Sequence, residues 1–63
     1  MKIIETLEAS FKAEIARRVL NVQIMLANPM AIHDHTDYMG AIESELDKIA
    51  EVQDRLEALD ACR

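Results

Sequence analysis

A single dipeptide, Asn28-Pro29, interrupts a chain that otherwise favours helix throughout its 63 residues. The residue before a proline is pushed out of the α region, so a helix is expected to end there. The chain has no other proline, one glycine and only two aromatic residues, a composition that suits helices better than sheets. We therefore predict an all-α fold with helices over residues 2–27 and 35–61 and a loop over 28–34, all within one domain.

Apolar residues recur at spacings of three and four on both sides of this break, which is the period of an amphipathic helix. In the first half they are Ile4, Leu7, Phe11, Ile15, Val19, Val22 and Leu26. In the second half Met39, Leu46 and Gln53 fit the a positions of a heptad, and Ile42, Ile49 and Leu56 fit the d positions. Two such helices joined by a short loop predict an antiparallel hairpin. Its predicted core and interaction residues are Phe11, Ile15, Val22 and Leu26 facing Ile42, Leu46, Ile49 and Leu56.

The sequence also bears on whether two polar residues near the second apolar stripe, Gln53 and Glu45, are buried or exposed. Gln53 can fix register if it is buried, or Val52 can take the core position and leave Gln53 in water. Glu45 is expected on the charged, solvent-facing side, where substitution by alanine should change stability by less than about 0.5 kcal/mol.

A lone hairpin of this length is expected to need partner chains. Chains this short bury only about 60% of their unfolded surface. A small fold is usually completed by disulfides, a metal or association, and a single cysteine, Cys62, allows no intrachain disulfide. We predict completion of a helical bundle by homo-oligomerisation or by docking on a larger protein assembly.

Charge is distributed unevenly between the halves. Residues 1–28 hold four bases and three acids, a net +1, whereas residues 29–63 hold three bases and nine acids, a net −6. Nucleic-acid binding depends on many Lys and Arg contacts, so this balance argues against it. The Arg17-Arg18 pair can contact a phosphate or, alternatively, form ion pairs with the acids of the second helix.

The cluster His33-Asp34-His35-Thr36-Asp37 holds the residue types that ligate transition metals. A closed zinc site needs four ligands, and no further histidine or cysteine is nearby in sequence. His33 and His35 are therefore candidate metal ligands at most, and a polar turn followed by a helix start is the alternative. Glycine-rich phosphate loops and Cys-His or Ser-His pairs at a recognisable spacing are absent from the sequence. We expect no enzymatic activity, cofactor or small-molecule substrate.

No apolar run approaches the roughly 20 residues that span a bilayer, and the start of the chain meets an acid at Glu5, which is unlike a secretory signal. The expected location is the cytoplasm of a host cell or a virion, without membrane contact.

The segment 28–37, followed by Ala41-Ile42-Glu43, Lys48-Ile49-Ala50-Glu51 and Asp54-Arg55-Leu56-Glu57, resembles small uncharacterised helical proteins of tailed bacteriophages. The shared pattern is NP-x-AI-x-x-H-x-D followed by an acidic amphipathic helix, and it covers about the last 35 residues. The resemblance implies no activity and no site residues.

The sequence thus predicts a non-enzymatic protein–protein interaction module, with a structural or assembly component of a phage particle as the leading hypothesis. One alternative is a phage-encoded regulator that binds and inhibits a host protein. A second alternative is a small metal-binding protein that uses the His33/His35 loop.

Overall fold

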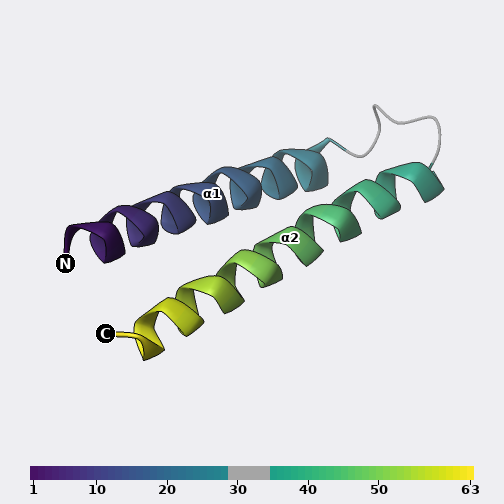
Figure 1. Cartoon of the computed structure of the whole chain (residues 1–63). Helices are drawn as coiled ribbons and strands as arrows, with labels where there is room; N and C mark the ends of the chain where they lie inside the picture. Colours follow the sequence, from purple (N-terminus) through teal and green to yellow (C-terminus); the bar gives the residue numbers. More distant parts are fainter. Residues whose placement is uncertain (29–34) are drawn as a thin grey trace.

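The computed structural model describes residues 1–28 and 35–63, and only the backbone of residues 35 and 36. Helix α1 covers Lys2–Ala27 and helix α2 covers His35–Ala61. The two helices lie side by side and antiparallel, with both chain ends at the same end of the molecule (Figure 1). The chain is therefore an all-α helical hairpin, as the sequence predicts, and its helices have the predicted ranges. Of the predicted loop, residues 29–34 lie outside the described residues.

The end of α1 is fixed by Asn28. Its backbone leaves the α region, with φ −128° and ψ 50°, and its N–H donates to the carbonyl of Met25 at 3.4 Å. The side-chain amide Nδ2 of Asn28 donates to the carbonyl of Ile24 at 3.0 Å. These two bonds satisfy carbonyls that every helix leaves unpaired in its last turn. The predicted helix end before Pro29 thus coincides with a capped terminus.

The helices meet along a continuous seam, whose members are spaced alternately three and four residues apart as in a coiled coil. On α1 the seam comprises Ile4, Glu8, Phe11, Ile15, Arg18, Val22 and Met25, and on α2 it comprises Tyr38, Ile42, Glu45, Ile49, Val52, Leu56 and Leu59. All of these residues are buried or partly buried. Among the other side chains that the structure describes, only Glu14 is equally covered.

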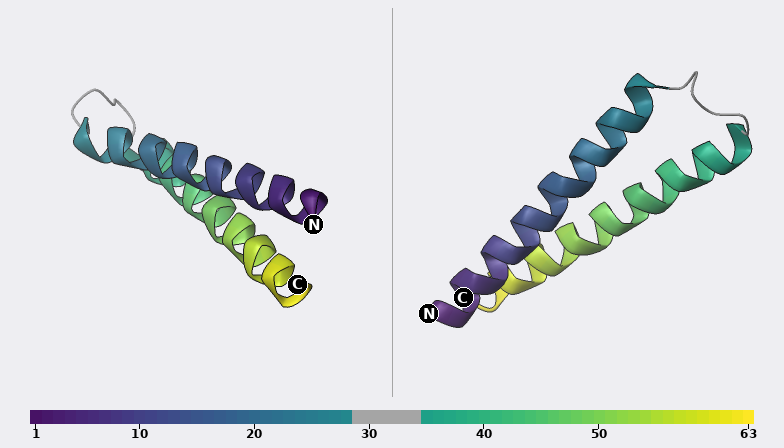
Figure 2. Two further views of the ribbon diagram at one scale, coloured as in Figure 1. Left: turned by 90° about the vertical axis from the view of Figure 1, so that its left-hand side faces the viewer. Right: turned by 90° about the horizontal axis from the view of Figure 1, so that it is seen from above.

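The apolar centre of the seam is thin. In the described part of the chain the buried hydrophobic residues are Val22, Ile49 and Val52, and Val52 is the most completely enclosed at 2% exposure. Phe11, Ile15, Ile42 and Leu56 are partly buried, in agreement with their predicted place between the helices. The Cα trace measures 48 × 15 × 11 Å, so the hairpin is one helix thick (Figure 2).

Two predicted core residues, Leu26 and Leu46, are exposed. Leu26 is 62% exposed because the seam of α1 passes from Val22 to Met25, which leaves Leu26 one residue beyond the contact. Leu46 is 50% exposed because Glu45, directly before it, occupies the seam. The prediction that these two leucines face the opposite helix within the hairpin is therefore wrong.

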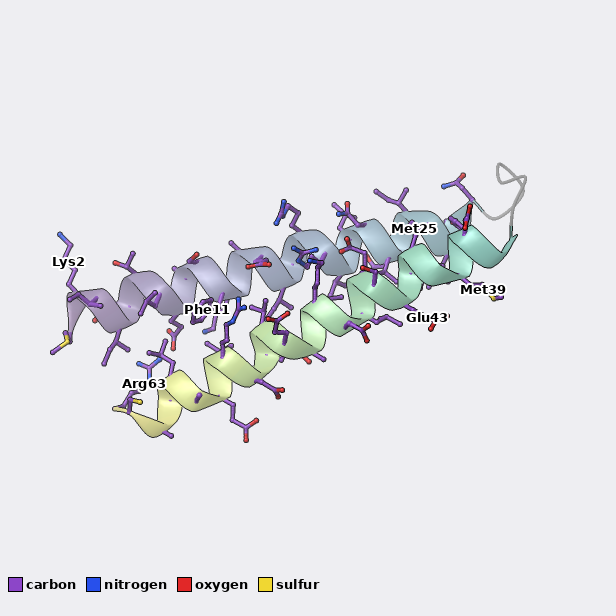
Figure 3. All side chains as sticks on the ribbon, turned by 45° about the vertical axis from the view of Figure 1, so that its right-hand side comes forward. Lys2, Phe11, Met25, Met39, Glu43 and Arg63 are labelled. Carbon is purple, nitrogen blue, oxygen red and sulfur yellow. The ribbon has the colours of Figure 1, made fainter. Side chains whose placement is uncertain are left out.

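The predicted heptad of α2 is correct at its d positions and wrong at its a positions. Met39, Leu46 and Gln53 are all exposed, and Val52 fills the place that the prediction assigned to Gln53. Figure 3 shows Met39 directed away from α1. Since Gln53 faces water within the hairpin, it does not set the register of α1 against α2.

Candidate interaction surface

A charged layer interrupts the seam near its middle. Arg18 of α1 donates from Nη1 to both carboxylate oxygens of Glu45 on α2, each at 3.2 Å, and from Nε to Glu14 Oε2 at 3.0 Å. The side chains of Arg18 and Glu45 retain only 18% and 24% of their exposure. Of the Arg17-Arg18 pair, Arg18 therefore binds an acid of the second helix, Glu45, and its other partner, Glu14, lies on α1.

The surroundings of Arg18 favour its charged form. The hydrogen bond to Glu14 raises the pKa of the Arg18 guanidinium, and the bond to Glu45 and the charges of both carboxylates act in the same direction, against partial desolvation. A charge-assisted contact across a seam is satisfied only when the two helices pair at one level. The layer consequently specifies the alignment of α1 with α2, a role that polar seam residues have in other coiled coils.

A second ion pair joins the two ends of the chain. Arg63 Nη2 contacts Glu8 Oε2 across the hairpin, and Arg63 Nε donates to Asp60 Oδ1 at 2.9 Å. Arg63 follows Leu59 by four residues, so it continues the seam beyond the end of α2. The pair is more exposed than the Arg18 layer, with 42% of the Arg63 side chain in water.

Large apolar side chains remain outside the seam on both helices. In the described part of the chain the exposed ones are Met1, Ile3, Leu7, Val19, Leu20, Ile24, Leu26, Met39 and Leu46. Scattered exposed apolar residues are normal, but a contiguous apolar patch marks an interaction site. The positions of these side chains around the hairpin therefore show whether they are scattered or form a contiguous patch.

Along each helix, seam residues are separated alternately by three and by four positions. Where the separation is four, the first of the three residues in between lies on one side of the seam and the last lies on the other. A two-fold axis relates antiparallel helices, so equivalent positions of α1 and α2 fall on the same side of the hairpin. One side carries Glu5, Lys12, Val19 and Leu26 from α1 and Met39, Leu46, Gln53 and Asp60 from α2. The opposite side carries Leu7, Glu14, Asn21 and Asn28 from α1 and Ala41, Lys48, Arg55 and Cys62 from α2.

Four exposed apolar residues thus gather on one side, at the end of the hairpin away from the termini. We call Val19, Leu26, Met39 and Leu46 the distal apolar patch. On the same side but nearer the termini lie Glu5, Lys12, Gln53 and Asp60, the proximal polar set, all of them exposed. The division between the two sets falls at the same level on both helices.

The outward faces of the two helices, opposite the seam, differ in character. α2 presents acids there, including Glu43, Asp47, Asp54 and Glu57, all exposed. α1 presents alanines with Leu20 and Ile24. Near the N-terminus of α1 a shallow hollow is lined by Lys2, Ile3, Thr6 and Leu7, all within two turns of this helix. Such a hollow offers no enclosed site for a small molecule.

The sequence-derived metal hypothesis falls largely outside the described residues. His33 lies among residues 29–34, and only the backbone of His35 is described, as the first residue of α2. Over residues 1–28 and 35–63 no group of three His, Cys, Asp or Glu side chains converges as metal ligands would. In the same part of the chain, neither helix combines the length and hydropathy that crossing a bilayer requires.

Comparison with known proteins adds no relative. A scan against protein-family models and searches of curated proteins and of solved structures found no match to this chain. The surface itself is thus the basis for proposing a function.

Proposed function

We propose that this chain is a non-enzymatic protein–protein interaction module that binds through the distal apolar patch. The observation that carries the proposal is the contrast between a thin core of Val22, Ile49 and Val52 and four exposed apolar side chains on one side. Chains this small are marginally stable alone. Covering the patch with another protein surface removes apolar area from water and stabilises the hairpin at the same time.

The resemblance to small helical proteins of tailed bacteriophages supports a more specific form of this proposal. In that form the module is a structural or assembly component of a phage particle, present in repeated copies. Peptide mass spectrometry of purified virions tests it: peptides of this chain at a stoichiometry comparable with other structural proteins support it, and their absence contradicts it.

The interaction proposal is tested separately by site-specific photocrosslinking in the cell that produces the chain. A photoreactive residue replaces Leu46, and in a matched control it replaces Glu51, which is also exposed on α2 but is polar and outside the patch. Adducts with another protein chain from position 46 and not from position 51 support the proposal. Equal yields from both positions, or no adducts at position 46, contradict it.

A further inference from the structure

We propose that the partner of the distal apolar patch is a second copy of this chain, and that the two hairpins join with their loop-connected ends at the same end of a four-helix bundle. This inference rests on the proposed function and names its partner. The exposed side chains and the charges of the two helices select both the partner and the orientation.

The size of the surface fits a second hairpin. The side that carries the patch follows the 48 Å and 15 Å extents of the Cα trace, an area of roughly 700 Å² before side chains widen it. A stable protein–protein interface buries about 800 Å² on each partner. The same side of a second copy has the same length and width, so the two sides match in extent.

Two closed two-fold arrangements bring these sides together. If the axis runs along the helices, each α1 lies beside α2 of the second copy, and both distal patches meet at one end. If the axis runs across the helices, α1 lies on α1 and α2 on α2, and the patches lie at opposite ends. Closed symmetry of this kind is the common form of a homodimer.

The pattern of apolar and polar residues selects the first arrangement. With the axis along the helices, Val19 and Leu26 pack on Leu46 and Met39 of the second copy, and the proximal polar sets meet one another. With the axis across the helices, each apolar patch covers a proximal polar set and buries the charges of Lys12, Glu5 and Asp60 against apolar side chains. Burying unpaired charge is costly, so the second arrangement is disfavoured.

Net charge selects the same arrangement independently. The segment that contains α2 carries −6 and the segment that contains α1 carries +1. The first arrangement places each acidic helix between two mildly basic ones, whereas the second places α2 directly against α2. One like-charged approach remains in the first arrangement, between Glu5 and Asp60 of the second copy. It lies at the open end of the bundle, where Arg63 already binds Asp60.

Cys62 permits a direct test of the orientation on the natural sequence. It is an exposed, free thiol near the C-terminus, on the side opposite the patch. A nitroxide attached there reports the distance between the two copies by pulsed electron–electron double resonance. In the proposed bundle both labels lie at one end, separated by the bundle width of roughly 20–30 Å, given helix spacings of about 8–10 Å. The opposite arrangement separates them by about the 48 Å length of the hairpin.

Variants test whether the patch forms the interface. Leu46→Lys should weaken dimerisation by roughly tenfold or more in sedimentation velocity, because it places a charge in the apolar contact. Ile24→Lys changes a comparably exposed residue on the outward face of α1 and should leave dimerisation unchanged. Circular dichroism of both variants at high concentration separates loss of association from loss of helix.

A short label distance together with selective loss in Leu46→Lys supports the inference. A distance near the hairpin length overturns the proposed orientation. A wild-type chain that is helical but monomeric at about 100 μM overturns the second copy as partner. Photocrosslinks from position 46 to a different protein alone would preserve the interaction proposal and refute this one. The two proposals are therefore distinguishable.

Discussion

Arg18 binds both carboxylate oxygens of Glu45 across the helix pair, at 3.2 Å each, and these two residues occupy the same level of the seam. Along α2, Glu45 stands between Ile42 and Ile49 at the spacing of a core residue. A carboxylate can stay there because the guanidinium compensates its charge and Glu14 supports the guanidinium from the same helix as Arg18. The hairpin therefore has a largely apolar seam with a charged contact near its middle that fixes its alignment, in addition to the more exposed Arg63–Glu8 pair at the chain ends.

This contact predicts that Glu45→Ala lowers the thermal midpoint of the hairpin, contrary to the neutral effect expected from sequence. The change leaves Arg18 partly covered with Glu14 as its remaining acid. In a double-mutant cycle with Arg18→Ala, the two effects should be less than additive, since either change removes the same contact.

The matched control for that cycle is Glu51→Ala. Glu51 is also an acid on α2, but it is exposed and pairs within its own helix with Arg55 at 2.8 Å. It should change the midpoint little and show no coupling to Arg18→Ala. Equal midpoints for Glu45→Ala and Glu51→Ala would contradict the assigned role of the layer.

The apolar part of the seam predicts a large effect of Ile49→Ala. Ile49 is buried between the helices, and large-to-small changes at buried sites cost about 2–5 kcal/mol of unfolding free energy. The control Ile24→Ala makes the same substitution on the outward face of α1 and should cost about 0.5 kcal/mol or less. Urea denaturation followed by circular dichroism measures both. The burial assignment would fail if the two variants unfolded at the same midpoint.

Helix formation and pairing follow directly from sequence, because they depend on local features. Pro29 and the three-and-four spacing of apolar residues suffice to place α1, α2 and the hairpin. The exact seam does not follow from apolar residues alone. Leu46 fits an apolar stripe as well as Ile42 does, and a search for apolar side chains passes over Glu45. Glu45 can occupy the seam because its charge is paired with Arg18. Leu46, the next residue, then lies beside the seam and is exposed.

A usable signal for the correct seam was nevertheless present in the sequence. The series Ile42, Glu45, Ile49, Val52, Leu56 and Leu59 keeps the alternation of three and four without interruption. The series through Met39, Leu46 and Gln53 instead requires a polar amide at its third a position. The α2 series contains an acid, Glu45, and the corresponding series of α1 contains a base, Arg18. Together these two residues indicate a charged layer between the helices. The distal apolar patch follows only after the seam is assigned, because its residues are defined by their side of it.

Gly40 offers a stabilising substitution. It lies inside α2, its φ is not positive, and a Cβ built on it meets no atom within 4 Å. Glycine in a helix interior costs up to about 1 kcal/mol relative to alanine, mainly through the freedom it gives the unfolded chain. Gly40→Ala should therefore raise the unfolding free energy by about 0.5–1 kcal/mol, measured by urea denaturation. Destabilisation by this change would show that the helix backbone near residue 40 differs from the described one.

Replacing the whole charged layer by apolar residues should separate stability from alignment. In Arg18→Leu/Glu45→Leu the seam becomes apolar at that level. Glu14 loses Arg18 as its partner but keeps 30% of its side-chain exposure, so water can solvate its charge. Exchange of a paired charge layer for apolar residues is often neutral or stabilising in other proteins, so the thermal midpoint should stay equal or rise. The requirement that α1 and α2 meet at one level is then lost, since leucines pack with several neighbouring side chains. We expect extra or broadened amide signals for seam residues such as Val52 in ¹H–¹⁵N spectra. The single variants should instead be less stable than the double variant, because Arg18→Leu leaves Glu45 in the seam without its partner and Glu45→Leu leaves Arg18 with Glu14 alone. A double variant with one sharp signal per residue and the wild-type pattern of contacts would show that apolar packing alone sets the alignment.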